Sequence, residues 1–165
     1  MAGQAPTLSG YTSFIRNVMR IGTDVLPDNS PYIEASYQAA LDWVAPVLAL
    51  IPSGSATQPS LYARAVYNLA GDRMVNYAQD APDAPPVSGS DLPYFANIRA
   101  TMKLDAFVGG VVSSTSDEGT SVSLAVPDEI AKGMTFDNLQ RMKTPWGREY
   151  LGIIQSLGPS VWGVT

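Results

Sequence analysis

Hydrophobic and polar positions recur with helical spacing along most of the chain, most clearly between residues 60 and 80. Apolar residues there return every three or four positions, the spacing of one face of an α-helix. A polar stripe is formed on the opposite face by Arg64, Asn68 and Asp72, which lie four residues apart. Prolines stand on both sides of the stretch and mark its ends. The pattern predicts a central helix whose apolar face consists of Tyr62, Ala65, Val66, Leu69, Ala70, Met74 and Tyr77.

Further helices are predicted before and after the central one. Pro46 lies inside the second of them and predicts a kink or an early end near Ala45. A polar loop at 52–59 and a proline-rich loop at 81–93 flank the central helix. The other predicted helices cover residues 11–21, 31–50, 93–103, 135–142 and 144–157.

One segment has the pattern of strands instead. Residues 107–112 are apolar and β-branched, residues 121–126 alternate strictly, and turn-forming residues lie between them. This pattern predicts a β-hairpin, which must pack on the helices or pair with another copy, because two strands alone are marginal in water. The expected fold is therefore mainly α, a small helical bundle around a central helix with one β-hairpin insertion. Residues 1–165 form a single domain, in which 1–10 are a flexible N-terminal arm and 158–165 a C-terminal docking tail.

The composition excludes several kinds of chemistry. The chain contains no cysteine and no histidine, which removes disulfides, thiolate nucleophiles, histidine triads and the commonest metal ligand. A net charge of −5 argues against a nucleic-acid-binding surface. No run approaches the ~18 apolar residues of a membrane span, and the N-terminus lacks the pattern of a secretory signal. No nucleotide-binding glycine motif occurs either, so we expect no cofactor.

The acidic residues do not form a recognisable metal or catalytic site. Asp80, Asp83 and Asp91, or Asp117 with Glu118, lack the spacing of a calcium loop, so solvated loop carboxylates are the preferred interpretation and no metal is expected. A carboxylate-based hydrolase would need two acids about 5 to 9 Å apart in a cleft. The acids here lie mainly in predicted loops and on polar faces, which argues against an enzyme.

The order of motifs in the second half of the chain is distinctive. A Ser/Gly-rich turn and an SVS segment precede a final helix opened by a T-x-W-G-x-x-Y-L pattern. Together with the alanine-rich central helix, this order over residues 30–157 resembles the small helical head–tail connector proteins of tailed bacteriophages. The residues of the pattern in this chain are Thr144, Trp146, Gly147, Tyr150 and Leu151.

The resemblance implies a structural virion protein of the phage neck, made in the host cytoplasm, that assembles as a ring, usually dodecameric, beneath the portal. Its partners would be the portal, further copies of itself and the tail or next neck protein, and DNA would pass through its channel without sequence-specific binding. We hypothesise that the hairpin contacts ring neighbours or the tail through Ser113, Asp117, Glu118, Val122 and Leu124. The tail would dock on the portal through Val161, Trp162 and Val164. Two alternatives stay open, another neck or tail-completion protein and a monomeric protein-binding adaptor.

Overall fold

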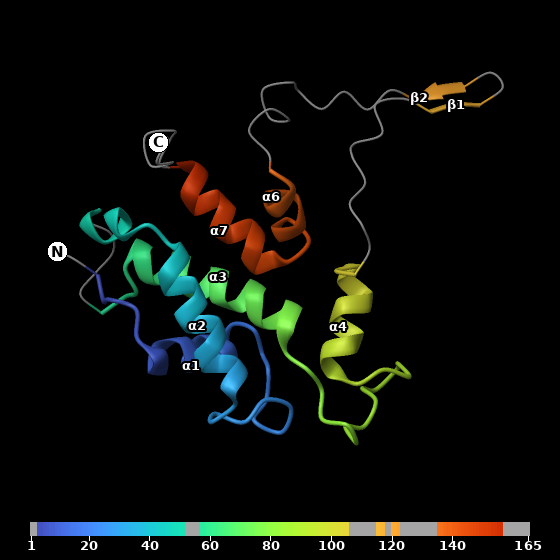
Figure 1. Cartoon of the computed structure of the whole chain (residues 1–165), viewed down its shortest axis with the longest axis horizontal. Coiled ribbons are helices and arrows are strands. Elements are labelled where there is room, and N and C mark those ends of the chain that lie inside the picture. Colours follow the sequence, from blue (N-terminus) through green and yellow to red (C-terminus); the bar gives the residue numbers. More distant parts are fainter. Residues whose placement is uncertain (1–2, 52–56, 106–114, 118–119, 123–134, 157–165) are drawn as a thin grey trace.

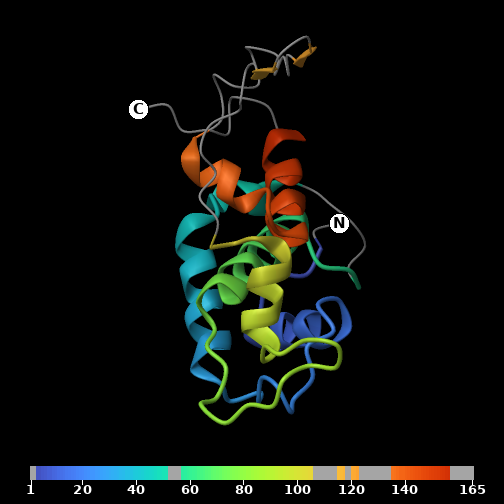
Figure 2. The same cartoon turned by 90° about the vertical axis from the view of Figure 1, so that its right-hand side faces the viewer.

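The computed structural model describes residues 3–51, 57–105, 115–117, 120–122 and 135–156, and the described part of the chain is mainly helical, as predicted. Its helices are α1 (Leu8–Asn17), α2 (Pro31–Trp43), the 3₁₀ helix η1 (Pro46–Leu50), α3 (Leu61–Tyr77), α4 (Tyr94–Met102), α6 (Phe136–Arg141) and α7 (Pro145–Ser156). The central helix α3 lies between α2 and α7 and also contacts α1, η1 and α4 (Figure 1 and Figure 2). The prediction that the fold is organised around this helix is therefore confirmed.

Local sequence signals set most of the helix ends. The hydroxyl of Ser60 accepts a hydrogen bond from the amide of Ala63 at 3.1 Å and caps the N-terminus of α3. The predicted break near Ala45 is confirmed, because α2 ends at Trp43 and a separate 3₁₀ helix begins at Pro46. The chain therefore turns at the proline and carries Leu48 back into the core.

The described part of the N-terminal segment is held on the body, which differs from the expected flexible arm over residues 1–10. The amide of Gln4 donates to the carbonyl of Gln58 at 2.9 Å, and the amide of Ser60 donates back to the carbonyl of Gln4 at 2.9 Å. Thr7 caps α1, which begins three residues earlier than predicted. The Tyr67 hydroxyl accepts a hydrogen bond from the Thr7 amide at 3.0 Å, so α3 itself anchors the segment.

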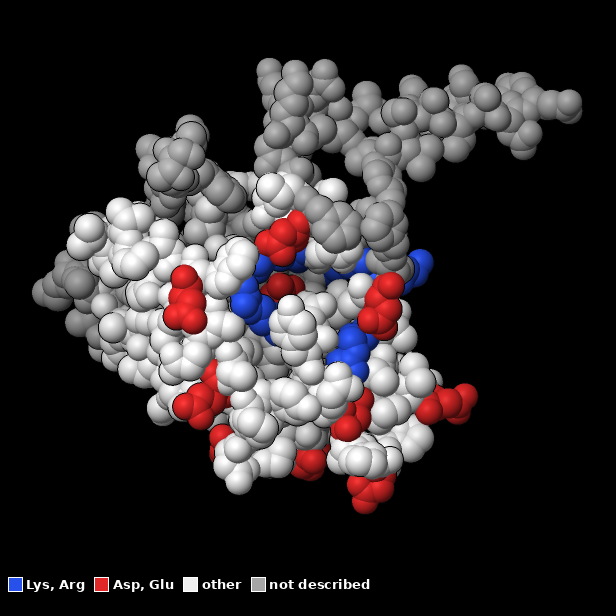
Figure 3. All heavy atoms as spheres, viewed as in Figure 1, with Lys and Arg blue, Asp and Glu red and all other residues white. Residues whose placement is uncertain are grey.

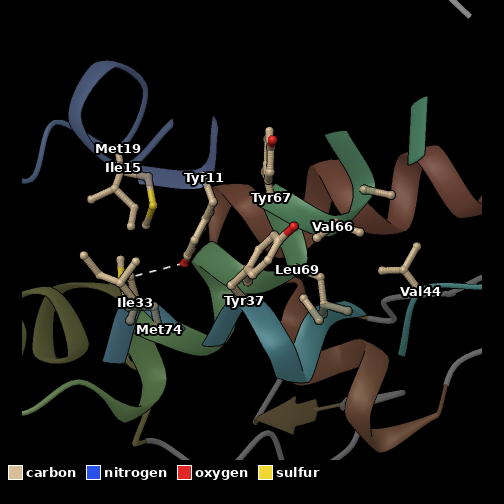
Figure 4. Packing of buried hydrophobic residues seen from close by; sticks show 14 of the residues in the cluster. Tyr11, Ile15, Met19, Ile33, Tyr37, Val44, Val66, Tyr67, Leu69 and Met74 are labelled. Atoms are coloured by element: carbon tan, nitrogen blue, oxygen red, sulfur yellow. Dashed lines mark hydrogen bonds between the residues drawn. The ribbon is translucent and has the colours of Figure 1, made fainter. Parts of the chain in front are cut away.

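The core centres on aromatic side chains between α1, α2 and α3 (Figure 4). Tyr11 is fully buried and stacks on Tyr37 and Tyr67, with ring centroids 5.9 and 6.0 Å away. Its hydroxyl lies 3.1 Å from the hydroxyl of Ser36 and donates to the sulfur of Met74. The buried phenol is thus hydrogen-bonded at its polar end, which is the condition for burying a tyrosine without penalty.

The predicted faces of α3 need two corrections. The stripe was expected to lie opposite the apolar face, but Asn68 and Asp72 are buried at 7% and 4% exposure, because α7 packs over them. Arg64, at the start of the stripe, pairs with Glu149 of α7 at 3.1 Å. Tyr77 was expected in the core and is instead 68% exposed, because it is the last residue of α3 and projects beyond the packed part of the helix. The central helix is therefore covered on its polar side as well as on its apolar side.

The strands do not follow the prediction. β1 (Thr115–Asp117) pairs antiparallel with β2 (Thr120–Val122), so that Ser116 lies opposite Ser121. β1 falls in the stretch predicted to be the turn, and the strand predicted at 107–112 lies outside the described residues. The predicted hairpin insertion with strands at 107–112 and 121–126 is not supported. Two three-residue strands are also too short to be stable on their own.

A lysine joins the end of α4 to the start of α7. Lys143 Nζ donates to the backbone carbonyls of Lys103 and Leu104, at 2.9 and 3.3 Å. These carbonyls follow the last turn of α4, where helix carbonyls lack intrahelical partners. Within the described residues, no helix is both long and apolar enough to cross a bilayer.

Candidate functional site

A buried carboxylate lies at the centre of the junction between α3 and α7. Asp72 of α3 accepts a hydrogen bond of 2.5 Å from the hydroxyl of Thr144, the residue just before α7. On the other side of the carboxylate, Arg141 Nη1 lies 3.9 Å from Asp72 Oδ2. Arg141 is itself held by Asp137, one turn earlier on α6, through contacts of 2.8 and 2.7 Å from Nε and Nη2. The junction is therefore a polar cluster that connects α3, α6 and α7.

Burial dominates the ionisation of Asp72. Removal from water raises the pKa of its carboxyl from 3.8 to about 6, although the Thr144 hydrogen bond and the charge of Arg141 oppose the rise. Desolvation prevails because the side chain is almost completely covered by α7 and Arg141 is too far away for a close ion pair. Asp72 thus changes its charge near pH 6, well above an ordinary aspartate.

Thr144 and Gly147 show what the T-x-W-G-x-x-Y-L pattern does at the start of α7. Thr144 is fully buried, and its hydroxyl accepts a hydrogen bond from the amide of Gly147 at 2.8 Å while donating to Asp72. A side chain at position 147 would collide with the backbone, since a Cβ there would lie 2.1 Å from the carbonyl oxygen of Arg141. One threonine and one glycine therefore set α7 directly against α3.

The other pattern residues continue this junction. Leu151 is buried, Trp146 is partly buried against the core, and the half-buried Tyr150 ring lies 5.7 Å from Arg141 Cζ. All five residues of the predicted pattern, from Thr144 to Leu151, thus lie on the side of α7 that the bundle covers or at its edge.

A pocket of about 650 Å³ opens beside Asp72, between α2, α3 and α6. In Figure 3 basic and acidic spheres gather around a hollow near the centre of the face shown. Two guanidinium groups stack on the ring of Trp43, with Arg73 Cζ at 4.8 Å and Arg141 Cζ at 5.6 Å from its centroid. Tyr77 contributes to the lining from the end of α3. Asp72, Asp105 and Asp137 line the same pocket, which therefore combines aromatic rings, two arginines and three carboxyl groups.

Two buried nitrogens of this pocket have no hydrogen-bond acceptor. They are Nε of Arg73 and Nη1 of Arg141. Buried N–H groups are nearly always paired, and leaving one unpaired costs about 1 to 3 kcal/mol. Both nitrogens are closed off from solvent, so they belong to the wall of the pocket and not to its open space. Its size and its mixture of charged and aromatic side chains make the pocket the strongest candidate for a binding site in the described part of the chain.

Most of the residues predicted for protein contacts lie outside the described part. Asp117 ends β1, opposite Thr120, and Val122 ends β2, opposite Thr115. Those outside the described residues are Ser113, Glu118, Leu124, Val161, Trp162 and Val164.

Sequence reasoning missed the pocket because its residues come from three helices and from the segment that follows α4. Asp72 was noted only as part of a solvent-facing stripe, and Trp43, Arg73 and Arg141 were not singled out. The four-residue spacing of Asp137 and Arg141 was the one local signal, since it predicts an ion pair along a helix. Among the described residues, no three acidic side chains come together to hold a metal ion.

No protein-family model matches the chain, and no curated protein or solved structure is significantly similar to it. The pocket and the α3–α7 junction are therefore interpreted from their own chemistry.

Proposed function

We propose that this chain is a structural virion protein of a tailed phage, a ring-forming head–tail connector. It binds the portal, extends the DNA channel and offers the attachment surface for the tail. The observation that carries the proposal is the T-x-W-G-x-x-Y-L pattern, in which Thr144 and Gly147 join α7 to the central helix. Structural proteins that share this helical bundle have a reason to keep the pattern, because it fixes how two of the helices pack.

The surface is consistent with an assembling protein. Val47 and Leu50 of η1 are 45% and 79% exposed, and the neighbouring Trp43 is 61% exposed. Large apolar side chains that remain exposed close together are typical of protein contact surfaces. This observation also fits the alternative of a monomeric adaptor, so the experiment must distinguish the two.

The acidic character of the chain supports a passage for DNA. With 15 acidic and 10 basic residues, the chain lacks the excess of lysine and arginine that holds phosphates. An acidic channel wall would let DNA slide past without being retained.

The docking hypotheses keep their predicted residues. The tail contacts the portal through Val161, Trp162 and Val164, and the segment from 107 to 126 contacts ring neighbours or the tail. Both rest on the resemblance alone.

The test is to mix the purified protein with the assembled portal of the same phage and to image the mixture by cryo-electron microscopy. A ring seated on the portal is expected. Deletion of residues 158–165 should abolish binding while the far-ultraviolet circular dichroism spectrum stays that of the full chain. A bare portal beside free protein would overturn the connector proposal in favour of another neck protein or an adaptor. A ring that still forms after the deletion would refute only the docking role of the tail.

A further inference from the structure

The last described helix ends near the start of the central one. The first residues of α7 lie beside the second half of α3, because the hydroxyl of Thr144 is bonded to Asp72. Further along α7, Glu149 pairs with Arg64 in the first turn of α3. The two helices are therefore antiparallel, and Ile154 in the last turn of α7 is still buried in the core. The residues that follow α7 thus leave the bundle at the end where α3 begins.

The 3₁₀ helix η1 lies at the same end of the bundle. Ser36 in the first half of α2 and Met74 near the end of α3 both contact the hydroxyl of Tyr11, so α2 also runs antiparallel to α3. The end of α2 and the η1 helix that follows it therefore lie where α3 begins, and η1 contacts α3. In Figure 1 both η1 and the end of α7 are drawn on the left, near the first turns of α3.

One face of η1 is apolar and uncovered. Val47 and Leu50 are three residues apart, which places them on the same face of a 3₁₀ helix. Their exposed fractions are 45% and 79%, whereas Leu48 between them is fully buried. The stretch from 43 to 51 contains no charged residue. An exposed surface of this kind is typical of a contact site.

The tail, residues 158–165, matches this surface in its chemistry. It contains Val161, Trp162 and Val164 and no charged side chain. A tryptophan side chain buries about 150 to 250 Å² when it is covered, and tryptophan is among the residues that dominate contact surfaces. An apolar segment with one large aromatic ring is therefore a suitable cover for Val47 and Leu50.

The tail also begins within reach of η1. Both α7 and η1 pack on the start of α3, and packed helices lie about 8 to 10 Å apart, so η1 and the end of α7 are within about 20 Å of each other. Six positions lead from Ser156 to Trp162, and an extended chain of that length spans about 20 Å. The apolar segment at 106–112 begins elsewhere, because it follows Leu104, whose carbonyl is bonded to Lys143 just before α7. Position therefore favours the tail as the occupant.

We propose that the tail packs on η1 of its own chain and places Trp162 against Val47 and Leu50. The contact is apolar and intramolecular, so it does not depend on protein concentration. It does not rest on the connector function, because it follows from where α7 ends and from which face of η1 is uncovered. A partner that binds the tail would at the same time uncover Val47 and Leu50.

The test is nuclear magnetic resonance of the full chain with labelled valine and leucine methyl groups. Nuclear Overhauser effects are expected between the indole ring of Trp162, assigned with Trp162→Phe, and the methyl groups of Val47 and Leu50. Leu50→Gln should abolish them and move the indole N–H signal of Trp162 to the position of an unstructured tryptophan. Leu92→Gln is the matched control, because Leu92 is also exposed but precedes α4, which packs on the other end of α3. It should leave the Trp162 signal unchanged.

Each contrary outcome has a definite meaning. A wild-type Trp162 signal at the unstructured position, or one unaffected by Leu50→Gln, would overturn the proposal and leave η1 for a partner protein. A signal that moves to the unstructured position on roughly tenfold dilution would also overturn it, since the tail would then cover η1 of a second copy. Unchanged methyl signals of the buried Leu69 show that each variant keeps its fold. No portal enters these measurements, so their failure is distinct from a failure of the connector proposal.

Discussion

The hydroxyl of Thr144 donates a hydrogen bond to the buried carboxylate of Asp72 and accepts one from the amide of Gly147. One side chain thereby caps the last helix and attaches it to the central one. The residues of this junction give the clearest tests of how the fold is held together.

Replacement of Thr144 by valine should lower the free energy of unfolding by about 2 to 4 kcal/mol, because the helix loses its cap and Asp72 loses its donor. Thr144→Ser keeps the hydroxyl and should cost about 1 kcal/mol or less. Urea denaturation of both variants measures the difference. A valine variant as stable as the wild type, beside a destabilised serine variant, would mean that the methyl group, and not the hydroxyl, is what stabilises the junction.

Gly147→Ala should destabilise the fold by about 1 to 3 kcal/mol or more, because the new Cβ meets the backbone carbonyl of Arg141. Gly152 provides the matched control on the same helix, since a Cβ there meets nothing within 4 Å. Gly152→Ala should stabilise the protein by about 0.5 to 1 kcal/mol through helix propensity. Thermal unfolding of the pair is sufficient, and a shift of both melting temperatures in the same direction would contradict the packing described here.

The raised pKa of Asp72 predicts a specific pH dependence. The folded protein holds this proton up to about pH 6, whereas the unfolded chain releases it near 3.8. The stability contributed by Asp72 is therefore complete below about pH 4 and is lost as the pH rises to about 6, a change of about 2 to 3 kcal/mol. The Asp72→Asn variant lacks this loss, so its stability relative to the wild type should rise between pH 4 and 6. Parallel stability profiles for the two proteins would show that Asp72 ionises like an ordinary aspartate.

Tyr67→Phe should release the N-terminal segment from α3. The variant removes the acceptor of the Thr7 amide, which should cost about 0.5 to 1.5 kcal/mol and speed hydrogen exchange at Thr7. Tyr37→Phe serves as the control, because Tyr37 also lies in the aromatic core, whereas within the described residues the hydroxyl bonded to Thr7 is that of Tyr67. Unchanged exchange at Thr7 in Tyr67→Phe would indicate that the Gln4 pairing alone holds the segment.

Much of the helical framework could be predicted because its signals are local. Ser60 marks the start of α3 and Pro46 breaks α2 at the expected point, and both act through backbone groups only a few residues away. Gly71 in the middle of α3 lies at a close approach, since a Cβ there would be 3.1 Å from the sulfur of Met19. The period of apolar residues was sufficient to place these elements.

The polar junction could not be predicted in the same way. A buried aspartate and a solvent-facing one look alike in a helical pattern, and the partner that covers Asp72 is Thr144, far along the chain. Trp43 shows the opposite case, since a large aromatic residue inside a predicted helix remains mostly exposed and stacks with arginines. Both outcomes depend on which helices meet, and the period of one helix carries no information about that.

The hydrogen bonds from Lys143 to the carbonyls of Lys103 and Leu104 have a consequence for how this protein can change over evolution. They connect the end of α4 to the residues between α6 and α7, so a contact within the described part of the chain joins the segments before and after the stretch that separates α4 from α6. Lengthening such a connection costs only about 0.6 kcal/mol for each doubling. Insertions and deletions in this stretch should therefore be tolerated far better than changes at Lys143, and relatives could differ widely there while keeping the same bundle.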